Sequence, residues 1–157
     1  MKVKILYYSR SGNTENLAEK IAEELSCEML KVEPKESYGN YIMSCLRIMK
    51  EKFEETPPAF ATPVPDLSDV DIVIAGFPVW SQDIPRFFVN FLSSCDLAGK
   101  IVIPFCTYEI NKLDLIKPNG PLSTACSSAE LKLPLNYCIF RNNDYDGWIE
   151  QVKALCS

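Results

Sequence analysis

Residues 71–77 read DIVIAGF and are apolar at nearly every position. A strand with one face in water alternates polar and apolar residues, whereas a strand covered on both faces can be apolar throughout. The run is short and ends in glycine and an aromatic residue, which favours a strand over a helix. It therefore predicts a central strand of a parallel sheet that carries helices on both faces.

Other segments fit around this strand. β-branched and aromatic residues predict further strands at 3–8, 28–32 and 100–106 and within 133–140. Apolar residues at helical spacing predict helices at 15–25, 38–53, 85–92 and 146–155, with Thr14 as the cap of the first. The alternation predicts an α/β, doubly wound, five-stranded parallel sheet in one domain over 1–157, with 108–132 unassigned.

Composition narrows the possible chemistry. The chain of 157 residues has no histidine, which removes histidine bases and histidine metal ligands. Its seven cysteines are odd in number and form no Cys-x-x-Cys pair, so neither a disulfide framework nor an iron–sulfur site is indicated. We therefore expect a bound cofactor to carry any chemistry, with no catalytic side chain and no metal.

The charge and hydropathy of the chain bear on its partners. A formal net charge of -5 argues against binding to nucleic acid or to anionic lipid. No apolar run approaches the roughly 18 residues typical of a membrane helix, and we expect a cytoplasmic protein. Redox proteins are the expected partners, and the chain itself is expected to be a monomer or a homodimer.

The loop after the first predicted strand is the first candidate site. Ligands of an open parallel sheet bind beyond the carboxyl ends of its strands, where the strand order reverses. This loop offers hydroxyl groups, a glycine that lets the backbone approach an anion, and the amino end of a helix. We predict that it binds phosphate through Ser9, Arg10, Ser11, Gly12, Asn13 and Thr14.

Two other phosphate loops are not indicated. The chain lacks Gly-x4-Gly-Lys-Ser/Thr, which binds nucleoside triphosphates, and Gly-x-Gly-x-x-Gly, which binds dinucleotides. The alternative is a polar turn between strand and helix with no ligand, in which Thr14 only caps the helix.

The segment Tyr7–Thr14, which reads YYSRSGNT, resembles the phosphate-binding fingerprint of the flavodoxin family. The segment 76–80, GFPVW, resembles the second flavin loop of a branch with a Gly-x-Pro-x-Trp motif, and 97–107 resembles the approach to the third loop. Three motifs occur in order over residues 1–107, each at the end of a predicted strand. The resemblance implies a flavodoxin-like fold with strand order 2-1-3-4-5 and FMN as the cofactor.

The resemblance also implies the residues that hold FMN. The phosphate loop at 9–14 would take the FMN phosphate. One side of the isoalloxazine ring would be lined by Pro78, Val79, Trp80 and Ser81. The third wall would be formed by Cys106, Thr107, Tyr108 and Glu109. The indole of Trp80 would stack on the ring or meet its edge; the alternative is an aromatic residue that anchors its own loop.

The third loop departs from the family pattern. Relatives continue with serine and glycine after Cys-Thr, whereas residues 108–112 read YEINK. The bulky residues either block the ring site or supply Tyr108 as a stacking partner. Glu109 either lowers the flavin potential by repelling negative charge or faces water. Cys106 is either redox-active or a buried thiol.

These patterns favour an FMN-binding redox protein that transfers electrons at low potential. One alternative is a flavin-dependent NAD(P)H:quinone-type reductase. Another is a flavodoxin-like interaction module that has lost FMN, as the unusual loop after Thr107 allows. The segment 38–53 is large enough either to cover the flavin or to form a dimer face.

Overall fold

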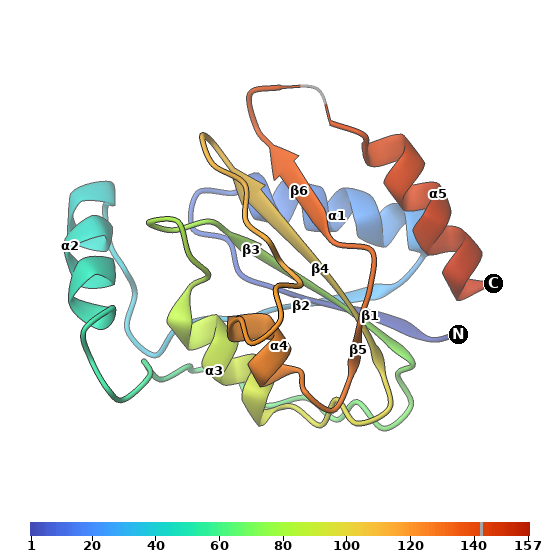
Figure 1. Cartoon of the computed structure of the whole chain (residues 1–157), viewed down its shortest axis with the longest axis horizontal. Coiled ribbons are helices and arrows are strands. Elements are labelled where there is room, and N and C mark those ends of the chain that lie inside the picture. Colours follow the sequence, from blue (N-terminus) through green and yellow to red (C-terminus); the bar gives the residue numbers. More distant parts are fainter. Residues whose placement is uncertain (142) are drawn as a thin grey trace.

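The computed structural model describes residues 1–141 and 143–157, and it places a parallel sheet between layers of helices (Figure 1). The strand order is β2-β1-β3-β4-β5, and β6 also pairs with β4. The strands are β1 (Val3–Tyr7), β2 (Glu28–Lys31), β3 (Ile72–Pro78), β4 (Ile101–Tyr108), β5 (Glu130–Leu131) and β6 (Leu135–Cys138). The helices are α1 (Asn13–Leu25), α2 (Tyr41–Glu51), α3 (Arg86–Ser94), α4 (Pro121–Ala125) and α5 (Tyr145–Cys156). The predicted fold class and strand order are confirmed.

Successive residues of β3 point to opposite layers. Ile72 and Ile74 pack in a buried cluster with side chains of α1 and α5, whereas Val73 and Phe77 pack with α3 and α4. Figure 1 shows α1 and α5 on one side of the sheet and α3 and α4 on the other. Both faces of β3 are thus covered, which is why residues 71–77 can be apolar throughout.

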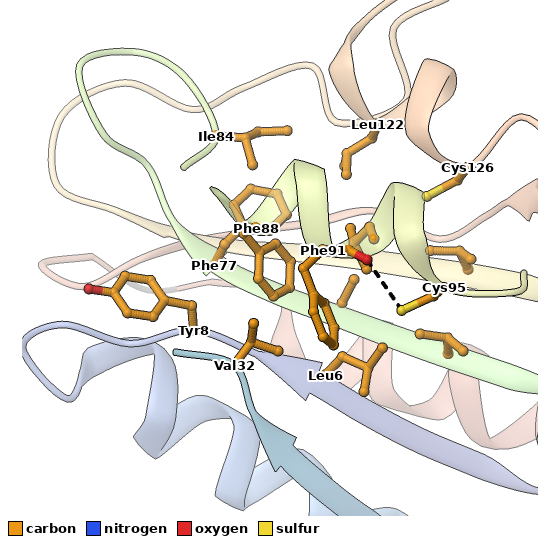
Figure 2. Close-up of a cluster of buried hydrophobic side chains, with 14 of the residues drawn as sticks. Leu6, Tyr8, Val32, Phe77, Ile84, Phe88, Phe91, Cys95, Leu122 and Cys126 are labelled. Carbon is orange, nitrogen blue, oxygen red and sulfur yellow. Dashed lines mark hydrogen bonds between the residues drawn. The ribbon is translucent and has the colours of Figure 1, made fainter. Parts of the chain in front are cut away.

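The layer beneath α3 is dominated by aromatic side chains. Figure 2 shows Phe77 of β3 packed together with Phe88 and Phe91 of α3. The Cys95 thiol donates to the Phe91 carbonyl at 3.4 Å and is buried, as expected of a free thiol in a core. This layer anchors α3 and, through it, the loop that follows β3.

Gly76 lets two central strands pack closely at the end that faces the loops. A Cβ at this position would lie 2.0 Å from the Phe105 ring of β4, so no larger residue fits without moving that ring. The contact fixes β3 against β4 two or three residues before the strands end. It thereby positions the loops that follow them.

The fifth strand position is divided between β5 and β6. β6 lies within 133–140, where a strand was predicted, whereas the two-residue β5 precedes that range. Glu130 pairs with Ile101 and Leu135 pairs with Phe105, so five steps of one strand oppose four of the other. Leu133 adopts a positive φ of 48°, and its carbonyl accepts from the Trp148 indole at 2.7 Å. The extra residue bulges out of the ladder, and α5 satisfies the carbonyl that it frees.

The segment 108–132, which the sequence left unassigned, contains α4 and β5. α4 has only five residues and begins with Pro121, and β5 has two. Elements this short have too few residues for a helical or alternating pattern to emerge.

No helix in the described residues combines the length and the apolar content needed to cross a bilayer.

Candidate functional site

A cavity of about 370 Å³ opens where the carboxyl ends of β1, β3 and β4 meet. Because β1 lies between β2 and β3, the strand order reverses here, as expected of a ligand site in an open sheet. The predicted site residues that line the cavity are Arg10, Ser11, Asn13, Pro78, Val79, Trp80, Ser81, Thr107, Tyr108 and Glu109. The other predicted residues, which do not line it, are Ser9, Gly12, Thr14 and Cys106.

The loop from Ser9 to Gly12 is closed by a hydrogen bond. The buried Ser9 hydroxyl oxygen accepts from the Gly12 amide at 3.1 Å, so its own proton can be donated elsewhere. Gly12 has φ of 98°, a left-handed conformation that favours glycine. The tight turn leaves Arg10 and Ser11 exposed at the cavity.

The first turn of α1 offers amide groups to a ligand. The prediction that Thr14 caps this helix is wrong: α1 begins at Asn13, and Gly12 occupies the capping position. Among the described residues no side chain accepts from the amides of this first turn. Unpaired amides and the positive end of the helix dipole together attract an anion.

The Thr14 hydroxyl has a structural role instead. It lies 2.7 Å from the Thr107 hydroxyl, and both side chains are buried. The bond joins the loop after β1 to the end of β4, although the two residues are far apart in the sequence. One of the two hydroxyls must donate to the other, which leaves a second proton available for another acceptor.

The loop after β3 turns sharply at the cavity rim. Ser81 and Gln82 both have positive φ, 46° and 63°, between two backbone hydrogen bonds of 2.8 and 2.9 Å that join Trp80 and Asp83. Non-glycine residues rarely adopt this conformation, and such strain gathers at functional sites. The Val79 amide donates to the Thr107 carbonyl at 2.9 Å, which ties this loop to the end of β4.

Trp80 is packed into the core more deeply than a stacking residue needs to be. Its ring makes edge contacts with Tyr8 and Tyr38, with centroids 5.3 and 4.6 Å apart, and only 9% of the residue is exposed. This packing matches the alternative in which Trp80 anchors its own loop. The indole still lines the cavity with the part that remains uncovered.

The third loop is held without glycine. The Asn136 side chain accepts from the Leu113 amide and donates to the Leu113 carbonyl, each at 2.9 Å. The same oxygen accepts from the Cys106 thiol at 3.0 Å. Asn136 of β6 therefore fixes the chain a few residues after Tyr108 and Glu109. Of these two residues, Tyr108 is half-buried and Glu109 is exposed.

Cys106 is a buried thiol, as one of the two alternatives had it. It is fully buried, and burial raises the pKa of Cys106 to about 12. A thiol with this pKa is almost entirely protonated at neutral pH and is a poor nucleophile. Within the described residues no group of three or more histidine, cysteine or acidic side chains could hold a metal ion.

Helix α2 forms a fourth wall that the residue-level prediction missed. Its cavity-lining side chains are Tyr41, Ser44, Cys45 and Ile48. Tyr41 also lies beside the phosphate loop, with its ring centroid 5.7 Å from the Arg10 guanidinium carbon. The spacing of 41, 45 and 48 marks one helix face, but sequence alone does not tell a cavity face from a core face.

The geometry combines an anion-binding end with a slot between apolar and aromatic walls. The anion end consists of the first turn of α1 and the loop 9–14. The slot lies between α2, the loop after β3 and the loop after β4. Such a site suits a flat, largely apolar ring system that carries a phosphate on a flexible chain.

Comparisons with known proteins agree with this fold. A family model described as flavodoxin matches residues 2–152. Among curated proteins none matches the chain. The comparison of solved structures found similar folds across nearly the full length of the chain, at low sequence identity.

Three of these structures illustrate the similarity. A protein from Bacteroides uniformis, described only provisionally as a flavoprotein, is 23% identical with a TM-score of 0.80, covering 97% of each chain. A flavoprotein from Lactobacillus acidophilus, solved in complex with FMN, is 20% identical with a TM-score of 0.70, covering 87% of this chain and 92% of its own. The two-electron reduced flavodoxin of Megasphaera elsdenii is 18% identical with a TM-score of 0.55, covering 97% and 96%.

Proposed function

The chain belongs to the flavodoxin family, and from this premise we propose that it binds FMN and carries electrons at low potential. One observation carries the proposal: α1 begins without a side-chain cap at Asn13, which lines the same cavity as Arg10 and Ser11 of the preceding loop. The FMN complex of the Lactobacillus acidophilus flavoprotein, which has a similar fold, supports the choice of cofactor.

The residues present fit FMN. The amides of the first turn of α1, the Ser11 hydroxyl and the Asn13 side chain would hold the phosphate, and Arg10 would add positive charge nearby. A cavity of about 370 Å³ lies within the range of roughly 300–1,000 Å³ that is usual for ligand sites. The Thr14–Thr107 bond keeps the phosphate end and the ring end in a fixed relation.

Val79, Tyr108 and Tyr41 would line the isoalloxazine ring from three elements. When bound, FMN supplies one- and two-electron transfer. The exposed Glu109 carboxylate on the rim would disfavour negative charge on the ring and so lower its potential. Because Cys106 is buried and protonated, the electrons would reside on the cofactor alone.

A carrier role is favoured over a reductase by the form of the site. Three of the residues that line the cavity, Tyr41, Ser81 and Glu109, are exposed to solvent. An exposed rim lets a protein partner approach the ring edge. With a net charge of -5, the chain favours a partner that presents positive charge.

Anaerobic electron transfer tests this role. The FMN-loaded protein is reduced with light and a sacrificial donor, then mixed with cytochrome c, a basic one-electron acceptor. We expect stoichiometric reduction of cytochrome c at a rate that falls as ionic strength rises, because attraction between opposite charges is screened.

Two outcomes would contradict the carrier role. Sustained turnover of NADPH with menadione as acceptor would indicate a quinone-type reductase. Failure to take up FMN at all would indicate an interaction module without cofactor. Both assays use the same preparation, so they separate the three possibilities directly.

A further inference from the structure

Helix α2 presents an unusual outer surface. The exposed fractions of Ile42, Leu46, Met49 and Phe53 are 70%, 60%, 58% and 88%. Ile42, Leu46 and Met49 stand at positions i, i+4 and i+7, which fall on one side of the helix. Phe53 lies two residues past the end of α2, in a turn whose amide still donates to the Lys50 carbonyl at 3.1 Å, and it extends the same side. The four side chains form a continuous stripe. We call them the α2 stripe. Exposed apolar residues are ordinary when scattered, but a stripe of this length indicates an interaction surface.

The α2 stripe is distinct from the cofactor site. Tyr41, Cys45 and Ile48 face the cavity from a side of the helix about 100° away from the stripe. Figure 1 shows α2 standing at one margin of the molecule, apart from the helices that cover the sheet. Binding of FMN would therefore leave the stripe exposed.

Polar contacts fix the stripe outward. The side of α2 that faces the protein buries Ser44 and Glu51. Glu51 accepts from the Tyr38 hydroxyl at 2.8 Å and from the Arg47 guanidinium at 3.0 Å. At the end of the helix, Lys52 donates to the Ser81 carbonyl at 2.7 Å. Turning the stripe inward would break a buried ion pair, which is strongly unfavourable.

The α2 stripe is complementary to a second copy of itself. Around the midpoint of the stripe, Ile42 mirrors Phe53 and Leu46 mirrors Met49, at equal separations in the sequence. If two copies meet with their helices antiparallel about a twofold axis, Ile42 of each lies against Phe53 of the other. A twofold interface requires this reciprocity, in which each contact occurs twice.

Area favours a second copy, and charge does not oppose it. At the carboxyl end of α2, Lys50 pairs with Glu54 at 3.7 Å, and Lys52 and Glu55 are exposed beside them. The two lysines and two glutamates balance, so this end does not repel the amino end of a second copy. The stripe supplies on the order of 500 Å² of apolar surface per copy, against about 800 Å² per partner in a standard interface.

We propose that the α2 stripe is the interface of an antiparallel, twofold homodimer of modest stability. The interface is separate from the cavity and needs no cofactor. Loss of the dimer would therefore leave FMN binding unchanged, and loss of FMN binding would leave the dimer in place.

Sedimentation velocity from about 1 to about 200 μM tests the dimer, because the dimer fraction must rise with concentration by mass action. We expect the wild-type chain to shift from monomer to dimer, with or without FMN. Leu46→Glu should remain a monomer throughout. Ile116→Glu, which changes an exposed isoleucine outside α2, should behave as the wild type does. Circular dichroism shows whether each variant folds.

A wild-type chain that stays monomeric at the highest concentration would overturn the proposal, as would a dimer that survives Leu46→Glu. The orientation has its own test in a Cys45→Ser background. Disulfides should form between Ile42→Cys and Phe53→Cys chains when the two are mixed, more than within either alone. Because these positions lie about 16 Å apart along the helix, dominant Ile42→Cys homodimers would indicate parallel pairing and refute the antiparallel arrangement.

Discussion

The two ends of the cavity are built in opposite ways. The phosphate end is local: residues 9–14 of one loop and the first turn of α1 supply all its groups, and the Ser9–Gly12 bond closes it. The ring end is assembled from α2 and the loops after β3 and β4. The local end can be recognised from a short motif, whereas the assembled end depends on tertiary packing.

The largest expected effect separates two aromatic residues of the ring end. Trp80→Ala should lower the free energy of unfolding by about 3–5 kcal/mol, because the buried indole packs against Tyr8 and Tyr38. Tyr41→Ala should change it by less than about 0.5 kcal/mol, because Tyr41 is exposed. Urea denaturation of the FMN-free protein measures both. Equal losses would show that Trp80 does not anchor its loop.

The next effect concerns the phosphate end. Ser11→Ala should weaken FMN binding about 10- to 100-fold, since a hydrogen bond to a charged group contributes roughly 1.5–3 kcal/mol. Affinity for riboflavin, which lacks the phosphate, should stay nearly constant. Ser11→Thr retains the hydroxyl and serves as the matched control. Fluorescence titration gives the affinities, and unchanged FMN affinity in Ser11→Ala would refute the phosphate assignment.

At the ring end the expected effect on binding is smaller and of a different kind. Tyr41→Ala should weaken FMN and riboflavin by the same factor of about 2 to 10, because an aromatic contact is worth roughly 0.5–1.5 kcal/mol and does not involve the phosphate. The titration is the same as for the phosphate variants. A loss confined to FMN would mean that Tyr41 acts through Arg10 and the phosphate instead.

The smallest effect is a difference in thiol labelling. Alkylation of the native protein near pH 8 should modify the half-exposed Cys45 and leave Cys106 unmodified, because burial raises the pKa of Cys106 to about 12. FMN should slow the labelling of Cys45, which lines the cavity. Mass spectrometry of peptides reports both sites. If FMN does not change the rate at which Cys45 is labelled, α2 lies outside the ring site.

The contrast also explains what the sequence could predict. The apolar run 71–77 and the motif at 9–14 are local signals. The fold followed from the first, and the second indicated a loop that the structure places at the cavity. The bulge at Leu133 could not be predicted, because a tryptophan of α5 satisfies its carbonyl across the chain. Likewise, the sequence suggests that Thr14 caps a helix, because it cannot show that the Thr107 hydroxyl lies 2.7 Å from the Thr14 hydroxyl.

For the ring end, the sequence indicated which segments take part, but it did not indicate all of the side chains that line or support the cavity. The segment 38–53 was expected to cover the flavin or form a dimer face, and its spacing correctly indicated a helix. The cavity side of α2 could not be told from its outer stripe, because both carry apolar residues at helical spacing. Asn136, which secures the glycine-free loop after β4, is distant in sequence and belongs to no motif.

The central claim is that the amides and hydroxyls at the start of α1 bind the phosphate of FMN. Parallel titrations of the cofactor-free wild-type chain with FMN and with riboflavin, followed by flavin fluorescence, test it most directly. The account predicts one FMN per chain and an affinity at least about 100-fold higher for FMN than for riboflavin, since the phosphate alone makes the charged hydrogen bonds. Equal affinities, or no binding of FMN at high micromolar concentration, would contradict it.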